Sequence, residues 1–159
     1  MKIDEVQSGD VLAWSSNSKV SYLKLCEGII RFFTMSEFCH VGVALRINDK
    51  LYVLEAVEPE VSLTDITDTN DFYCIPMNIM WTDGYEVLLK EHLGNTYSIM
   101  DAIRGYLGKP STNNNRWQCA ELVNDFYKKI GIDLGNSYTP SKLIKEVMSV
   151  TGNSLVYIK

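Results

Sequence analysis

The sequence has little of what marks several common classes of protein. No apolar run approaches the about 20 residues that a membrane-spanning helix needs, so an integral membrane segment is not expected. Histidine occurs only twice, and the four cysteines include no CxxC pair, so a metal site is not expected. No GxGxxG or GxxxxGK(S/T) stretch is present to cradle a phosphate, and no GxSxG turn to expose a serine nucleophile. We therefore expect no cofactor.

Positive charge is also scarce relative to negative charge. Fifteen lysine and arginine residues oppose twenty aspartate and glutamate residues, which gives a net charge of −5. Nucleic-acid binding draws on cationic side chains that displace counterions, so a nucleic-acid partner is not expected. Residues 1–8 are too polar and acidic for a secretory signal, and widely spaced cysteines are typical of reduced thiols. We expect a cytoplasmic protein unless another route releases it, and the sequence leaves its oligomeric state open.

The remaining composition is that of an ordinary globular protein, with 46% hydrophobic and 22% charged residues. The length is close to that of one domain, so residues 1–159 are expected to form a single domain. Strand-like patterns dominate the first half and helical spacing the second, which predicts an α+β fold with helices packed on one side of a mainly antiparallel sheet. The expected strands are 11–14, 41–47, 51–57, 61–66, 72–76 and 155–158; the expected helices are 19–34, 85–93, 98–107, 117–130 and 141–150.

A predicted hairpin around residues 48–49 brings two polar side chains together. With a symmetric two-residue turn, Gly42 faces Glu55, and His40 becomes a diagonal neighbour of Glu55 on the same face. Such neighbours lie roughly 7–8 Å apart at the backbone, within reach of a glutamate side chain. A histidine oriented by a carboxylate is the base half of a nucleophilic site, although His40 taken alone is more typical of a hydrogen-bonded structural histidine. The opposite face of the hairpin is expected to be core and carries Val41, Val43, Leu45, Tyr52, Leu54 and Ala56.

The second histidine, His92, is expected to have only a structural role. It falls at the end of the expected helix 85–93, just before Gly94. A histidine in that position complements the helix dipole.

Cys119 is the candidate nucleophile. It falls in the first turn of the expected helix 117–130, where free backbone N–H groups and the helix dipole lower a thiol pKa and stabilise an oxyanion. The alternative is a small buried residue on an amphipathic helix. Cys26 and Cys74 have no comparable context and are expected in the core, while Cys39 is expected to point to the strand face opposite His40.

Four segments occur in a recognisable order: Gly9-Asp10-Val11-Leu12, His40-Val41-Gly42-Val43, Leu54-Glu55-Ala56, and Trp117-Gln118-Cys119-Ala120-Glu121-Leu122-Val123. Together they resemble the circularly permuted NlpC-like cysteine hydrolases, in which the histidine strand precedes the cysteine helix. Residues 93–97 and 138–141 are also similar to that family's segments, so the resemblance covers the chain from Gly9 to about Val150. It implies a papain-like fold, a sheet or barrel with helices on one side.

The resemblance also implies roles for individual residues. Cys119 would be the nucleophile, His40 the general base and Glu55 the carboxylate that orients the imidazole. The backbone N–H of Cys119 would stabilise the oxyanion, with Gln118 or Asn113 as candidate helpers. No glutamine precedes Cys119 at the spacing of papain-type enzymes; Asn113 lies six residues upstream.

The implied activity is that of a thiol hydrolase, a cysteine peptidase or amidase that cleaves an amide or peptide bond through an acyl-enzyme. Family members include enzymes acting on cell-wall peptides. Two alternatives stay open at this point. One is a lipid acyl hydrolase or acyltransferase of the lecithin-retinol acyltransferase type, and the other is a papain-fold binding module without turnover. The expected partner is accordingly a peptide, amide or lipid-acyl substrate.

Overall fold

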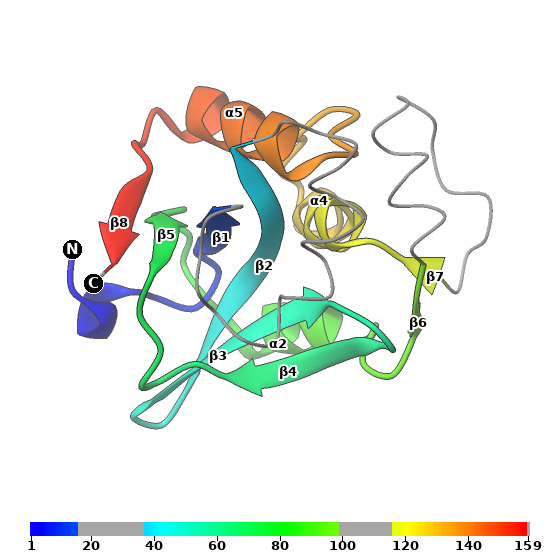
Figure 1. The fold of residues 1–159 in the computed structure, drawn as a ribbon, viewed down its shortest axis with the longest axis horizontal. Coiled ribbons are helices and arrows are strands. Elements are labelled where there is room, and N and C mark those ends of the chain that lie inside the picture. Colours follow the sequence, from blue (N-terminus) through cyan, green and yellow to red (C-terminus); the bar gives the residue numbers. More distant parts are fainter. Residues whose placement is uncertain (16–36, 99–115, 159) are drawn as a thin grey trace.

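The computed structural model describes residues 1–15, 37–98 and 116–158, and its largest element is a six-stranded sheet. The strand order is β4-β3-β2-β1-β5-β8, and every neighbouring pair is antiparallel. Figure 1 shows the long strand β2 crossing the middle of the molecule, between β1 and β3. The strands are β1 (Val11–Ser15), β2 (Phe38–Ile47), β3 (Lys50–Ala56), β4 (Val61–Asp65), β5 (Phe72–Ile75) and β8 (Val156–Ile158).

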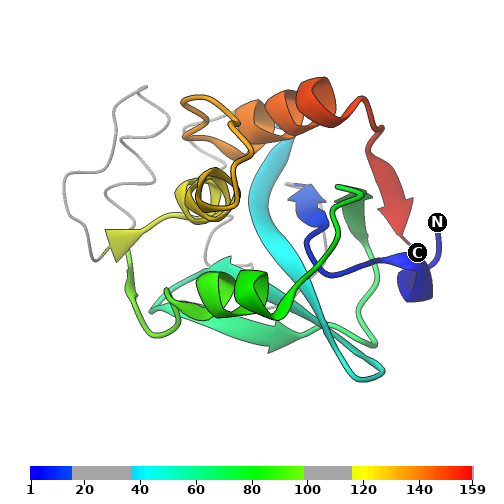
Figure 2. The same ribbon diagram turned by 180° about the vertical axis from the view of Figure 1, so that it is seen from behind.

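Smaller elements complete the described part of the chain. A short 3-10 helix, η1 (Ile3–Glu5), precedes the sheet, and two-residue strands β6 (Thr96–Tyr97) and β7 (Arg116–Trp117) pair in parallel. Both ends of the chain lie together on one side of the molecule, and the β6–β7 pair lies on the other (Figures 1 and 2). The helices are α2 (Asp83–Lys90), α4 (Cys119–Lys129) and α5 (Pro140–Thr151).

Local sequence explains where these helices begin and end. The side chain of Thr139 caps α5, Pro140 occupies its first turn, and Gly152 ends it in the left-handed conformation at φ 69°. Helix α4 carries an acidic residue in its first turn and two lysines in its last, both favourable to the helix dipole. The expected helix 85–93 instead covers Asp83–Lys90, so the expectation that His92 ends this helix is wrong.

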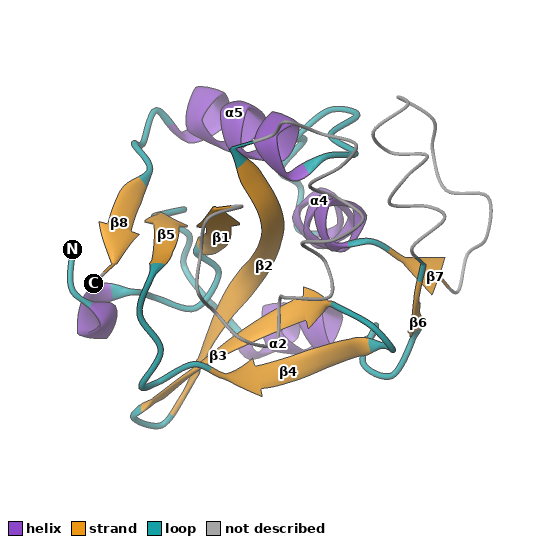
Figure 3. Cartoon of the chain, in the orientation of Figure 1, coloured by secondary structure: helices purple, strands orange, loops and turns teal. Residues whose placement is uncertain are grey.

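The described helices bury their apolar residues against one face of the sheet, as the α+β pattern predicts. Leu89 of α2, Val123 of α4 and Ile144 of α5 belong to one cluster that includes Val43 and Leu54 of the sheet. Figure 3 shows α4 beside β2 and α5 across one end of that strand. The opposite face is covered as well, by a second buried cluster: Val6, Leu12, Trp14, Ala44, Leu51, Val53, Ile66, Phe72, Cys74 and Ile158. The hairpin is therefore buried on both faces.

Buried polar contacts fix the start of β1 relative to α4. The Asp10 carboxylate accepts hydrogen bonds from the backbone N–H groups of Gln7 (2.8 Å) and Met77 (2.9 Å), and burial raises the pKa of this carboxyl despite those bonds. The Tyr127 hydroxyl of α4 donates to the carbonyl oxygen of Gly9. The Tyr127 contact therefore ties α4 to the turn that precedes β1.

The expected helix 19–34 and nearly all of 98–107 lie outside the described residues, as do Cys26 and Asn113. Within residues 1–15, 37–98 and 116–158, none of the helices combines the length and the apolar character that crossing a bilayer requires.

Candidate active site

The β2–β3 hairpin brings His40 and Glu55 into direct contact. Its pairing runs from Val43↔Leu54 to Ile47↔Lys50, which is the register of a symmetric turn at residues 48–49. The Nε2 atom of His40 lies 2.7 Å from Oε2 of Glu55. Because His40 is 1% exposed and Glu55 is 0% exposed, this contact is shielded from competing water.

The close approach of the two strands depends on Gly42. A Cβ built on Gly42 would lie 2.4 Å from Cγ2 of Val53 and 2.8 Å from the carbonyl oxygen of Leu54. The space beside this glycine is therefore filled by the neighbouring strand itself and is not free for another group. A side chain there would push β3 away from β2 and move Glu55 relative to His40.

The second carboxylate oxygen of Glu55 also has a donor. Thr64, on β4, donates its hydroxyl to Oε1 of Glu55 at 2.7 Å. Both oxygens of a fully buried carboxylate are thus hydrogen-bonded, which fixes its plane as well as its position. Sequence reasoning missed Thr64, because the β3–β4 register depends on a loop that is not a two-residue turn.

Cys119 is the first residue of α4, at the helix N-terminus that the sequence predicts for it. Its side chain is hydrogen-bonded to His40. Since Nε2 of His40 is held by Glu55, the ring nitrogen available to Cys119 is Nδ1. Cys119, His40, Glu55 and Thr64 therefore form one continuous chain of side-chain hydrogen bonds across three strands and a helix.

The charge state of His40 follows from its surroundings. Burial by itself disfavours the imidazolium, but hydrogen bonds to Cys119 and Glu55 and the negative charges of both groups outweigh burial. They raise the pKa of His40 from 6.5 to about 10. At neutral pH His40 is therefore an imidazolium, a cation that would stabilise a thiolate on a neighbouring cysteine.

The remaining described cysteines lie in different environments. The Cys39 thiol contacts the backbone carbonyl oxygens of Trp14 and Ser15, both at 3.6 Å. The Cys74 thiol lies 3.7 Å from Oδ2 of Asp10, and burial followed by the Asp10 charge raises its pKa far above the usual range. Neither thiol has the histidine partner that Cys119 has.

Gln118 and His92 are both engaged in contacts of their own. The side-chain amide of Gln118 donates to the carbonyl oxygen of Tyr138 at 2.8 Å, so one of its two N–H groups is already committed. Its role at an oxyanion stays a prediction, and Asn113 lies outside the described residues.

His92 is 7% exposed, with Nε2 2.8 Å from Asp125 and its ring 4.2 Å from that of Trp117. It ties α2 to α4 and takes no part in the cysteine site.

Removing the Thr64 hydroxyl should weaken the site without dismantling it. In Thr64→Val, Oε1 of Glu55 loses its donor, and a buried acceptor without a partner costs about 1–3 kcal/mol. We expect a loss of about 1–2 kcal/mol in the free energy of unfolding and several-fold slower alkylation of Cys119 at pH 7. Urea denaturation and mass-spectrometric labelling measure the two effects. Thr64→Ser, which keeps the hydroxyl, should restore most of the labelling rate; equal rates in all three proteins would contradict a role for this bond.

Known structures share this arrangement of elements. The chain is similar to the crystal structure of metalloprotein yiiX from Escherichia coli O157:H7, DUF1105, with a TM-score of 0.52 and 21% sequence identity. The match covers 95% of this chain and 88% of that chain, and at this identity it concerns the fold alone. No family model matches the sequence, and a search of curated proteins finds no match. The class that the fold defines is thus an α+β protein with a mostly antiparallel sheet, shared with yiiX.

Proposed function

We propose that this protein is a cysteine-dependent hydrolase of the circularly permuted, papain-like NlpC type, which cleaves an amide or peptide bond through an acyl-enzyme. The observation that carries the proposal is the hydrogen-bonded chain from Cys119 through His40 to Glu55. A thiol at a helix N-terminus, an imidazole and an orienting carboxylate are the three groups that thiol acyl transfer requires. Their order along the chain, with the histidine strand before the cysteine helix, supports the permuted type.

The geometry supports a two-step mechanism. The Cys119 thiolate attacks the substrate carbonyl carbon, and backbone N–H groups in the first turn of α4 stabilise the oxyanion that forms. As the carbon–nitrogen bond breaks, His40 donates its Nδ1 proton to the leaving amine, which leaves a thioester on Cys119. His40 then removes a proton from water, the resulting hydroxide attacks the thioester, and the acid is released with the thiolate restored. Glu55 keeps the Nε2 proton in place throughout.

The metal of yiiX has no counterpart in this proposal. Among the residues that the structure describes, no three histidine, cysteine, aspartate or glutamate side chains are grouped to hold a metal ion. The nearest candidates are already committed, since His40 contacts both Cys119 and Glu55, and Glu55 also accepts from Thr64. These residues do not fit a metal centre, and no step of the mechanism uses one.

The test is acylation by a small activated ester, because Cys119 is only 6% exposed. With p-nitrophenyl acetate we expect a burst of one equivalent of p-nitrophenol and an acetyl group on Cys119, detected by peptide mass spectrometry. Cys119→Ala should abolish both, whereas Cys39→Ala, which removes a buried thiol beside His40 in sequence, should retain them. Amide and lipid-ester substrates offered with competing nucleophiles then separate hydrolase from acyltransferase. An unacylated Cys119 in the wild type would overturn the proposal and favour the binding module.

A further inference from the structure

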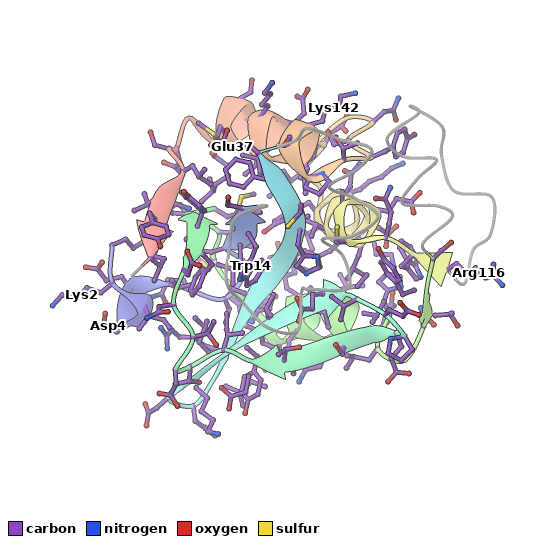
Figure 4. All side chains as sticks on the ribbon, in the orientation of Figure 1. Lys2, Asp4, Trp14, Glu37, Arg116 and Lys142 are labelled. Atoms are coloured by element: carbon purple, nitrogen blue, oxygen red, sulfur yellow. The ribbon has the colours of Figure 1, made fainter. Side chains whose placement is uncertain are left out.

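The imidazole of His40 has a third neighbour, Trp14, which the triad does not include. Trp14 on β1 pairs directly with His40 on β2. The two ring centroids are 5.4 Å apart, with the rings inclined at 45°. Trp14 is 0% exposed, and a second aromatic ring, Phe72, lies 5.8 Å from it. Figure 4 places Trp14 beside β2, in the interior of the molecule.

A β-bulge lies next to the Trp14–His40 pair. The β1–β2 register shifts between Trp14 and Ser15, so that Ser15 pairs with Phe38 and not with Cys39. The Cys39 thiol contacts the carbonyl oxygens of Trp14 and Ser15, both at 3.6 Å. Bulges of this kind re-aim a side chain locally. Here the extra residue is Cys39 on β2, immediately before His40, which pairs with Trp14.

Packing alone does not account for a tryptophan at this position. The Nε1 atom of Trp14 is buried without a hydrogen-bond partner in the part of the chain that the structure describes. A leucine or phenylalanine would contribute to the same cluster without leaving a buried donor unsatisfied. The large indole ring is, however, the side chain best able to attract a cation that lies within about 6 Å of its centroid.

The groups around the imidazole come from four elements. Cys119 of α4 and Glu55 of β3 are the charged partners, Thr64 of β4 orients Glu55, and Trp14 of β1 supplies an aromatic ring. The two charged partners hold the ring nitrogens, and the indole packs against the ring itself. Rotation of the imidazole out of the line between Cys119 and Glu55 would require Trp14 to move.

We propose that Trp14 is a positioning residue for His40, whose indole holds the imidazole in line between Cys119 and Glu55 and stabilises its charged form. The catalytic meaning of this contact rests on the proposed function, but its effect on His40 can be measured without a substrate. Trp14 acts through His40 and touches no reacting atom in this mechanism.

The experiment follows His40 by NMR titration in the wild type, Trp14→Phe and Trp14→Leu. The chain has only two histidines, so a His92→Gln sample identifies the His40 signals. We expect Trp14→Leu to lower the midpoint of His40 from near 10 by about one pH unit, with Trp14→Phe in between. Phe72→Leu removes an aromatic ring from the same cluster and should leave the His40 midpoint unchanged.

The outcomes distinguish this inference from the proposed function. If Trp14→Leu leaves the His40 midpoint within a few tenths of a pH unit of the wild type, the inference is wrong, whether or not Cys119 is acylated. If Phe72→Leu shifts the midpoint equally, the effect is general loosening of the cluster and the inference is also wrong. If the Trp14 variants shift the His40 midpoint, Phe72→Leu does not, and wild-type Cys119 is not acetylated, the role of Trp14 is supported and the proposed hydrolase function is wrong. If Trp14→Leu does not fold, the His40 midpoints of Trp14→Phe and Phe72→Leu are compared with that of the wild type by the same criteria.

Discussion

Replacing His40 with asparagine should slow the reaction of Cys119 with iodoacetamide at pH 6.5 by about a hundredfold. The thiolate is the reacting species, and an unassisted thiol with a pKa of about 8.5 is only about 1% ionised at that pH. In the wild type, His40 is an imidazolium at this pH, because its pKa is raised to about 10, and its positive charge would stabilise a thiolate on Cys119. Asparagine keeps a polar group beside Glu55 but provides no positive charge. Labelling rates for each cysteine, followed by peptide mass spectrometry over a range of pH, measure the difference.

The chain carries its own controls for this prediction. Cys74 is fully buried and its pKa is raised by burial and by Asp10, so it should label very slowly in every variant. His92→Gln removes the other imidazole, which lies beside Asp125 and away from the cysteine site, and should leave the Cys119 rate unchanged. A Cys119 that labels no faster than Cys74 in the folded wild type would contradict a thiolate at this position.

The raised pKa of His40 also makes the stability of the fold depend on pH. The pKa of His40 is raised from 6.5 to about 10 in the folded protein, because contacts with Cys119 and Glu55 overcome the effect of burial. Because its pKa is raised, His40 stabilises the folded state in full below about pH 6.5, and this stabilisation is lost as the pH rises through about 10. Across that interval we expect the free energy of unfolding of the wild type to fall by about 2 kcal/mol or more beyond that of His40→Asn. Urea titrations at pH 6.5, 8.5 and 10 measure it; parallel profiles would count against the charged pair.

Local rules were enough to predict the parts of the site that depend on neighbouring residues. A two-residue turn at 48–49 determines which residues of the hairpin face one another, and this pairing brings Glu55 to His40. Helical spacing after a polar loop was enough to place Cys119 in a first turn. That Cys119 meets His40 depends on how α4 packs on the sheet, and only the resemblance of the motif order to that of NlpC-like hydrolases indicated it.

The contacts that the sequence did not predict depend on longer-range pairing. Thr64 reaches Glu55 through the β3–β4 register, and Trp14 faces His40 through β1, which follows neither strand of the hairpin directly. The expected position of His92 at a helix end was wrong because α2 ends at Lys90, and the histidine instead contacts Asp125 of α4. In each case the partner is chosen by tertiary packing, which a local pattern does not encode.

Glu55→Gln should reduce acylation of Cys119 by at least about a hundredfold while changing the shape of the site least. Glu55 accepts a hydrogen bond at each oxygen, from Nε2 of His40 and from the hydroxyl of Thr64. A glutamine must present its NH₂ group to one of these two partners. If the NH₂ group faces His40, Nε2 has to accept, and the ring proton moves to Nδ1, the nitrogen that would receive the Cys119 proton.

The opposite orientation preserves the tautomer but removes the negative charge that supports the imidazolium. Both orientations therefore impair the site, and they differ in which nitrogen of His40 carries the proton. Acetylation kinetics give the rate, and ¹⁵N chemical shifts of the His40 ring give the tautomer. In the double variant Glu55→Gln/Thr64→Val, the Thr64 hydroxyl is absent, so an amide NH₂ group that points toward β4 has no acceptor. The NH₂ group should therefore face His40, and the tautomer with the proton on Nδ1 should predominate. A Glu55→Gln protein with the wild-type rate and Nε2 still protonated would mean that the buried carboxylate stabilises the fold and does not orient the base.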